Sequence, residues 1–162
     1  MRRLLPLLPL FALLLSGCYE TRIPVVAEGV RPDGIRDGRW RRADGSELEL
    51  SWAAAEGAFR VGAGGKVRLA PLGRLWLADY QAERNVVLLA RLAPDGVVLL
   101  EPTPETEKRL AAVHGLGVRP GPINRLAGGD GAAVRGFLAD LAALDGTGQL
   151  READRLVWVG PL

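Results

Sequence analysis

Apolar and polar residues alternate with a period of two over residues 46–52 of the chain. A strand with this alternation buries one face and wets the other, as in an antiparallel sheet. The segment Ala43-Asp44-Gly45 joins it to another β-like run at residues 38–42. An Asp-Gly pair between two such runs is a strong hairpin signal. The pattern therefore predicts a β-hairpin at the start of the folded part.

Further short strands are expected after this hairpin, at about residues 58–61 and 66–70. The next three runs differ because they are apolar at consecutive positions, and they lie at residues 75–78, 86–90 and 97–100. Strands of this kind are buried on both faces. Other elements must therefore cover their second face.

Helical signals follow these strands. Thr103 is an expected N-cap with Pro104 at the first helical position, which predicts a helix over residues 104–114. Asp130 is expected to cap a second helix over residues 131–144. The second helix carries an apolar stripe at i, i+3, i+4 and i+7 spacing, so it is the natural cover for the doubly apolar strands.

These elements predict an α+β domain over residues 38–162. It is expected to hold a curved antiparallel sheet or partial β-barrel of six or seven short strands, followed by two helices and a closing strand near residues 156–159. Residues 115–129, rich in Gly and Pro, are interpreted as irregular. The opening Gly38-Arg39-Trp40 resembles the Gly-x-Trp of lipocalins and other small β-barrels, in which the Trp plugs one end of the barrel. The two helices depart from the long uninterrupted meander of lipocalins.

The N-terminus has the pattern of a secretion signal. Met1-Arg2-Arg3 precedes an apolar block at residues 4–15, and Ser16-Gly17 supplies small residues at a cleavage site. The block is 12 residues long, short of the roughly 20 that a helix needs to span a bilayer. Residues 1–17 are therefore interpreted as a signal peptide that is removed.

Leu15-Ser16-Gly17-Cys18 resembles the lipobox of bacterial lipoproteins with a type II signal peptide, and the rest of the chain resembles small envelope lipoproteins. The resemblance implies that Cys18 receives a diacylglycerol group and usually an acyl chain on its amine. Such chains together give stable anchoring. It also implies a lipid-anchored location at the cell membrane or the outer membrane, facing the periplasm or the cell surface. The residue after Cys18 is Tyr19 rather than the Asp of many inner-membrane lipoproteins, so the resemblance favours the outer membrane if the cell has two membranes. Residues 18–37 are then interpreted as the anchor and tether.

The net charge of the chain bears on whether it binds nucleic acid. The chain has 21 Lys+Arg and 19 Asp+Glu, and two of the basic residues, Arg2 and Arg3, lie in the expected signal peptide. The mature chain of 145 residues, which is 162 less 17, would then hold 19 of each and a formal net charge of zero. Nucleic-acid binding needs a net or clustered positive field, so no nucleic-acid partner is expected.

Few residue types for catalysis are present. His114 is the single histidine, and a catalytic triad would need it to meet Ser46 or Ser51. Both serines are expected on or beside a wet strand face, without the turn that exposes a nucleophile. Zinc sites need several His or Cys ligands, and the recurrent Asp-Gly pairs lack calcium-loop spacing. We therefore expect no catalytic residue, no metal site and no cofactor, and interpret His114 as the end of a helix.

Two alternatives remain open at this level. Glu47 with Glu49, or Asp79 with Glu83, are carboxylate pairs of the type that hydrolases use, although each has a simpler explanation in a wet strand face or a loop. The tryptophans are expected either in the core or lining a pocket for an apolar ligand. The four are Trp40, Trp52, Trp76 and Trp158.

The preferred hypothesis is a non-catalytic, membrane-anchored envelope lipoprotein that docks another envelope component. The alternative is a small β-barrel that binds an apolar ligand.

Overall fold

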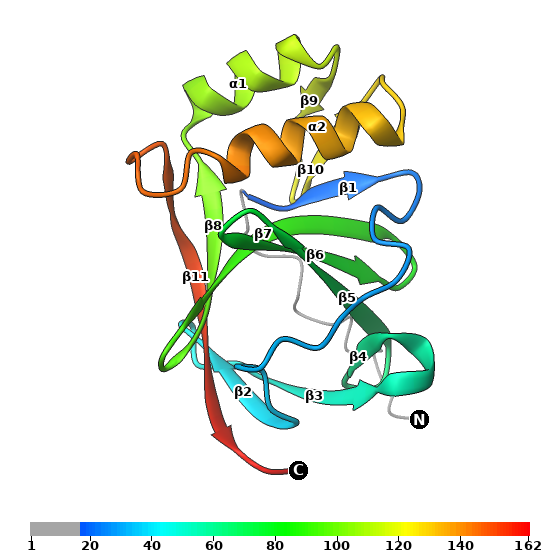
Figure 1. Cartoon of the computed structure of the whole chain (residues 1–162), viewed down its shortest axis with the longest axis vertical. Coiled ribbons are helices and arrows are strands. Elements are labelled where there is room, and N and C mark those ends of the chain that lie inside the picture. Colours follow the sequence, from blue (N-terminus) through cyan, green and yellow to red (C-terminus); the bar gives the residue numbers. More distant parts are fainter. Residues whose placement is uncertain (1–16) are drawn as a thin grey trace, which may run out of the picture.

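The computed structural model describes residues 17–162, and its main feature is a closed antiparallel β-barrel (Figure 1). The barrel strands are β2 (Gly38–Arg42), β3 (Glu47–Ala53), β4 (Ala58–Val61), β5 (Gly65–Leu72), β6 (Leu75–Gln81), β7 (Asn85–Ala93), β8 (Gly96–Pro102) and β11 (Leu150–Gly160). Strands β2 to β8 pair in sequence order as a meander, and β11 closes the barrel by pairing with both β8 and β2.

Closure corrects the expected partial barrel of six or seven strands. The closing strand was predicted at residues 156–159, but β11 contains 11 residues and pairs with both β2 and β8. Its first half is rich in charged residues and contains a bulge between Glu152 and Asp154. The bulge disturbs the period of two, which hid this half of the strand from pattern analysis.

Three short strands extend the sheet beyond the barrel. They are β1 (Tyr19–Thr21), β10 (Asn124–Ala127) and β9 (Gly117–Arg119), added in that order to β7. In Figure 1, β1 lies between the helices and the barrel. Residues 115–129, expected to be irregular, therefore contain two strands of the sheet.

The two helices confirm the sequence prediction within one or two residues. They are α1 (Pro104–Val113) and α2 (Gly131–Ala142), and the side chains of Thr103 and Asp130 cap them as expected. Both lie above the barrel in Figure 1. Phe137, Leu138 and Leu141 of α2 are fully buried in a core shared with the outward faces of β6, β7 and β8. The predicted cover for the doubly apolar strands is confirmed.

A second core fills the barrel itself. It consists of the inward side chains of the barrel strands, among them Trp40, Phe59, Leu69 and Leu88, all buried. An eight-stranded barrel has an interior just wide enough for side chains or one small ligand. The domain is thus built from two apolar layers that share the wall formed by β6, β7 and β8.

The expected tether at residues 18–37 packs on the domain. After β1, the chain crosses the outside of the barrel, where the backbone N–H groups of Val25 and Val26 donate to Oδ2 of Asp79, at 2.7 and 2.8 Å. Farther along, Val30 N donates to the carbonyl of Leu69 at 2.8 Å. We call residues 22–37 the strap. A single 3-10 turn, η2 (Ala54–Glu56), lies between β3 and β4.

Candidate functional site

The four tryptophans singled out in the sequence all lie on the inward face of the barrel. The pairing registers place Trp40 opposite Trp158, and Trp52 opposite Phe59. Trp40 is 1% exposed and belongs to the core, whereas Trp52, Trp76 and Trp158 are each half-buried at its margin. The structure therefore supports the core interpretation for Trp40. The other three tryptophans also point inward, but each is partly exposed to solvent.

The strap closes the barrel end at which β2 begins. The indole N–H of Trp40 donates to the carbonyl of Arg36 at 3.0 Å, and that of Trp158 donates to the carbonyl of Asp37 at 3.2 Å. The guanidinium of Arg36 stacks 4.1 Å from the ring centre of Trp158, a favourable cation–π geometry. Ile35, just before them, is buried in the barrel core. Two of the tryptophans thus hold the strap over this end.

Gly38 makes this closure possible. Its φ is +143°, a conformation that glycine adopts far more readily than other residues. A Cβ at this position would lie 2.3 Å from the carbonyl oxygen of Gly160 and 2.6 Å from Nε1 of Trp158. The Gly-x-Trp motif is therefore explained by packing: glycine lets β11 approach and Trp40 fills the interior.

The opposite end of the barrel contains a buried ion pair. Nε of Arg42 donates to Oδ2 of Asp154 at 2.7 Å, and both side chains are 7% exposed. The other oxygen of Asp154 accepts from the backbone N–H groups of Ala43 and Arg155 at 3.2 and 2.8 Å. Removing one partner of such a pair is strongly destabilising, so the pair fixes how β2 and β11 meet.

Cys18 lies next to this ion pair and is only 3% exposed. Burial raises the pKa of its thiol to about 12, while the positive charge of Arg42 opposes that rise and the charges of Asp154 and Glu101 add to it. A thiol with so high a pKa is almost entirely protonated at neutral pH and is a poor nucleophile. The expected signal peptide, residues 1–17, lies outside the described residues except for Gly17.

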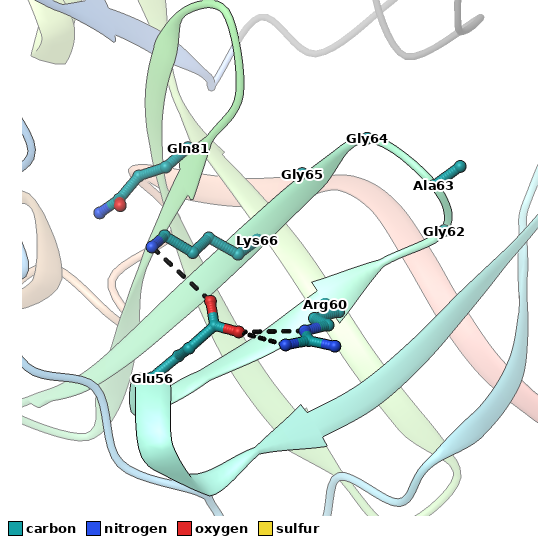
Figure 2. A pocket seen from close by; sticks show the side chains of 8 residues that line it. All are labelled: Glu56, Arg60, Gly62, Ala63, Gly64, Gly65, Lys66 and Gln81. Atoms are coloured by element: carbon teal, nitrogen blue, oxygen red, sulfur yellow. Dashed lines mark hydrogen bonds and ion pairs between the residues drawn. The ribbon is translucent and has the colours of Figure 1, made fainter.

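A hollow of about 310 Å³ lies at the β4–β5 turn, on the outside of the barrel, and Figure 2 shows the side chains that line it. Oε1 of Glu56 accepts two hydrogen bonds from Arg60, at 2.6 and 3.0 Å, and its other oxygen lies 3.8 Å from Nζ of Lys66. These partners, Arg60 first, lower the pKa of Glu56. Arg60 and Lys66 lie opposite each other on neighbouring strands, so Glu56 relieves the repulsion between like charges.

A second hollow, of about 470 Å³, separates the β5–β6 turn from the end of α2. Its lining is mostly small and apolar, and includes Leu72, Ala139, Ala142 and Ala143. Neither hollow contains any of the catalytic candidates from the sequence.

Glu47 and Glu49 lie on the same exposed face of β3, where Glu47 forms ion pairs with Arg39 and Arg41. The other candidates lie in different surroundings. Asp79 is fully buried under the strap, whereas Glu83 is exposed in the β6–β7 turn. Nε2 of His114 lies 2.7 Å from Asp140 and links α1 to α2 at the helix end, which confirms its expected place. Ser46 bonds to Asp44 inside the β2–β3 turn at 2.6 Å. Each group is used locally by the fold.

Sequence analysis named Asp79 only as half of a carboxylate pair with Glu83, and it predicted neither the binding of the strap by Asp79 nor the Arg42–Asp154 pair. One signal was available for Arg42, because alternation from Trp40 places it on the inward face, opposite Arg39 and Arg41. The signal for Asp79 was weaker, since its partners are backbone groups more than 50 residues away in the chain.

No helix within residues 17–162 is long and apolar enough to cross a membrane. No three His, Cys, Asp or Glu side chains in the same range gather in a way that suits a metal ion. Comparison with protein-family models, with curated proteins and with solved structures found no match to this chain.

Proposed function

We propose that the chain is a non-catalytic lipoprotein of the bacterial envelope, anchored by lipids on Cys18. The observation that carries this proposal is the sequence Leu15-Ser16-Gly17-Cys18, placed directly in front of β1. The segment before it has the charge and apolar length of a cleaved export signal. Acyl chains on one cysteine then hold the domain to the membrane, either the cell membrane or the outer membrane.

The burial of Cys18 determines whether lipid transfer precedes or follows folding of the domain. The thiol is a poor nucleophile in the folded chain because burial raises its pKa to about 12. Lipid transfer must therefore take place before the domain folds. A cysteine carrying a diacylglycerol group then lies outside the barrel, because the buried site of the thiol has no room for acyl chains. The first residue fixed in the sheet is then Tyr19.

The non-catalytic role is supported by the way the fold uses its polar groups. Asp79 binds the strap, Asp154 binds Arg42, and His114 lies beside Asp140. Closure of the barrel also changes where another envelope component would dock. A partner that docks by strand pairing needs an exposed edge strand, and β9 (Gly117–Arg119) is the outermost strand of the extension. Docking through strand pairing is proposed to use this edge.

The test is expression of the full chain in a bacterial host, with Cys18→Ala as the matched variant. Intact mass should show that the wild type lacks residues 1–17 and carries acyl groups, and it should sediment with membranes. The Cys18→Ala chain should carry no acyl mass and leave the membrane fraction. An unmodified Cys18 in the wild type would reject the proposal.

A second candidate function is the binding of an apolar ligand inside the barrel. It is favoured by three half-buried tryptophans, Trp52, Trp76 and Trp158, on the inward face of a closed eight-stranded wall. Pockets for such ligands are lined mostly by apolar and aromatic groups. Titration with a fluorescent apolar probe should quench tryptophan emission, and Trp76→Ala should weaken binding at least tenfold. Val113→Ala, at an exposed position of α1 (68% exposed), is the control. Equal affinities in the two variants would reject this candidate.

A further inference from the structure

Four charged side chains lie side by side on the sheet extension next to β1. Glu20 of β1 pairs with Arg125 of β10, and Arg125 pairs with Arg119 of β9. Residues directly opposite in neighbouring strands point to the same face of a sheet. From the β6–β7 turn, Arg84 reaches Oε2 of Glu20 at 3.3 Å, and Arg125 reaches Oε1 at 3.4 Å. We call Arg84, Arg119 and Arg125 the arginine row.

The arginine row is exposed and carries an excess of positive charge. The side chains of Arg84 and Arg125 are 65% and 55% exposed, and Arg119 is also exposed. Arg84 and Arg125 share the one carboxylate of Glu20, and within residues 17–162 no acidic group forms an ion pair with Arg119. Like charges directly opposite on paired strands destabilise a sheet. Folding alone does not account for the arrangement of Arg119 and Arg125.

The position of the row relative to the chain start indicates what it faces. Cys18 immediately precedes β1 (Tyr19–Thr21), which pairs with β7 on one side and β10 on the other. Cys18 is only two residues from Glu20 along the chain. The lipid anchor proposed for Cys18 would therefore emerge beside Glu20, with no flexible tether between the bilayer and the sheet.

We propose that the arginine row lies on the membrane surface and binds the headgroups of anionic phospholipids. This inference rests on the lipid anchor proposed above, which brings the row to the bilayer. The planar guanidinium group binds phosphate through two parallel hydrogen bonds. An anionic surface also relieves the repulsion between Arg119 and Arg125. The anchor supplies attachment, and the row fixes which side of the domain faces the bilayer.

The expected strength follows from general membrane electrostatics. A basic residue near an anionic surface strengthens binding by about fivefold. Replacing two arginines of the row with glutamine should therefore weaken binding to anionic vesicles by about 25-fold. The attraction should also weaken as salt is added, because salt screens exposed charges beyond about 10 Å at 0.1 M.

The experiment measures sedimentation of the mature chain, residues 18–162, with vesicles, in a Cys18→Ala background that carries neither lipid nor the apolar signal segment. The vesicles contain either pure phosphatidylcholine or phosphatidylcholine with phosphatidylglycerol. Arg84→Gln with Arg125→Gln tests the row. Arg39→Gln with Arg41→Gln is the matched control, because those two exposed arginines share Glu47 as Arg84 and Arg125 share Glu20.

The row variant should lose about 25-fold in affinity for the anionic vesicles, and the control pair less than twofold. Arg84→Lys with Arg125→Lys keeps both charges and should retain most of the binding, which separates loss of charge from loss of fold. Equal losses in the row and control pairs, or none in the row pair, would overturn the inference. Because the assay omits the anchor, it also separates the two proposals: fractionation of the wild type decides the anchor, and the vesicles decide the row.

Discussion

Replacing Asp79 with alanine removes the acceptor of two backbone N–H groups in the strap. Oδ2 of Asp79 accepts from Val25 and Val26, at 2.7 and 2.8 Å, and the residue is fully buried. A buried donor without a partner costs about 1–3 kcal/mol, so two donors cost about 2–6 kcal/mol. The substitution also removes Oδ1, which is buried and has no partner among the described residues, and this offsets part of the loss. We expect the free energy of unfolding to fall by about 2–4 kcal/mol.

Urea unfolding followed by tryptophan emission measures this loss, and amide hydrogen exchange locates it. Exchange should speed up at Val25 and Val26 far more than at the buried strands. Asp79→Asn keeps a side-chain carbonyl that can accept both bonds, so it should lose only about 1 kcal/mol. Glu83→Ala, which removes the exposed carboxylate of the next turn, should change stability by less than about 0.5 kcal/mol. If Asp79→Ala were as stable as Glu83→Ala, the reasoning that Asp79 holds the strap would be refuted.

Three further outcomes are expected from the buried groups. Burial raises the pKa of Cys18 from 9.0 to about 12, so between these pH values the folded chain keeps a proton that the unfolded chain loses. The free energy of unfolding, measured relative to Cys18→Ala, should therefore fall as pH rises, by up to about 1.4 kcal/mol per pH unit. Urea midpoints of the two unlipidated chains at several pH values check this expectation. Leu138→Ala, at a fully buried position of α2, should lose about 2–5 kcal/mol in the same urea assay. Asp154→Ala should lose about 3–5 kcal/mol because it removes the buried carboxylate that binds the guanidinium of Arg42. Arg42→Met with Asp154→Leu should recover much of that loss, and a double variant no better than the single one would contradict this expectation.

The local elements were predictable because their signals are local. The caps at Thr103 and Asp130 and the Asp-Gly hairpin turn at residues 43–45 act within a few residues of the chain. The apolar runs in β7 and β8 likewise required a cover, which α2 supplies. These parts of the fold follow from short-range physical rules that a single sequence contains.

The closure of the barrel and the buried polar contacts were not predictable in the same way. Whether a sheet closes depends on register and on the length of β11, whose charged first half does not look like a strand. Arg42 meets a partner 112 residues away, and Asp79 meets Val25 across 54. No periodic pattern specifies a pairing at that separation, and the partners of Asp79 are backbone groups that any residue type supplies.

The order of the strands has a consequence for how the chain folds as it is made. The pairing between β2 and β11 joins segments from opposite ends of the domain, and α1, β9, β10 and α2 must be made between β8 and β11. Until residues 150–160 are available, β2 and β8 are two unpaired edges of an open sheet, and open edges promote aggregation. Contacts between distant segments also slow folding. These two edges are therefore the last in the barrel to be paired, and cleavage within β11 would reopen the barrel at both of them.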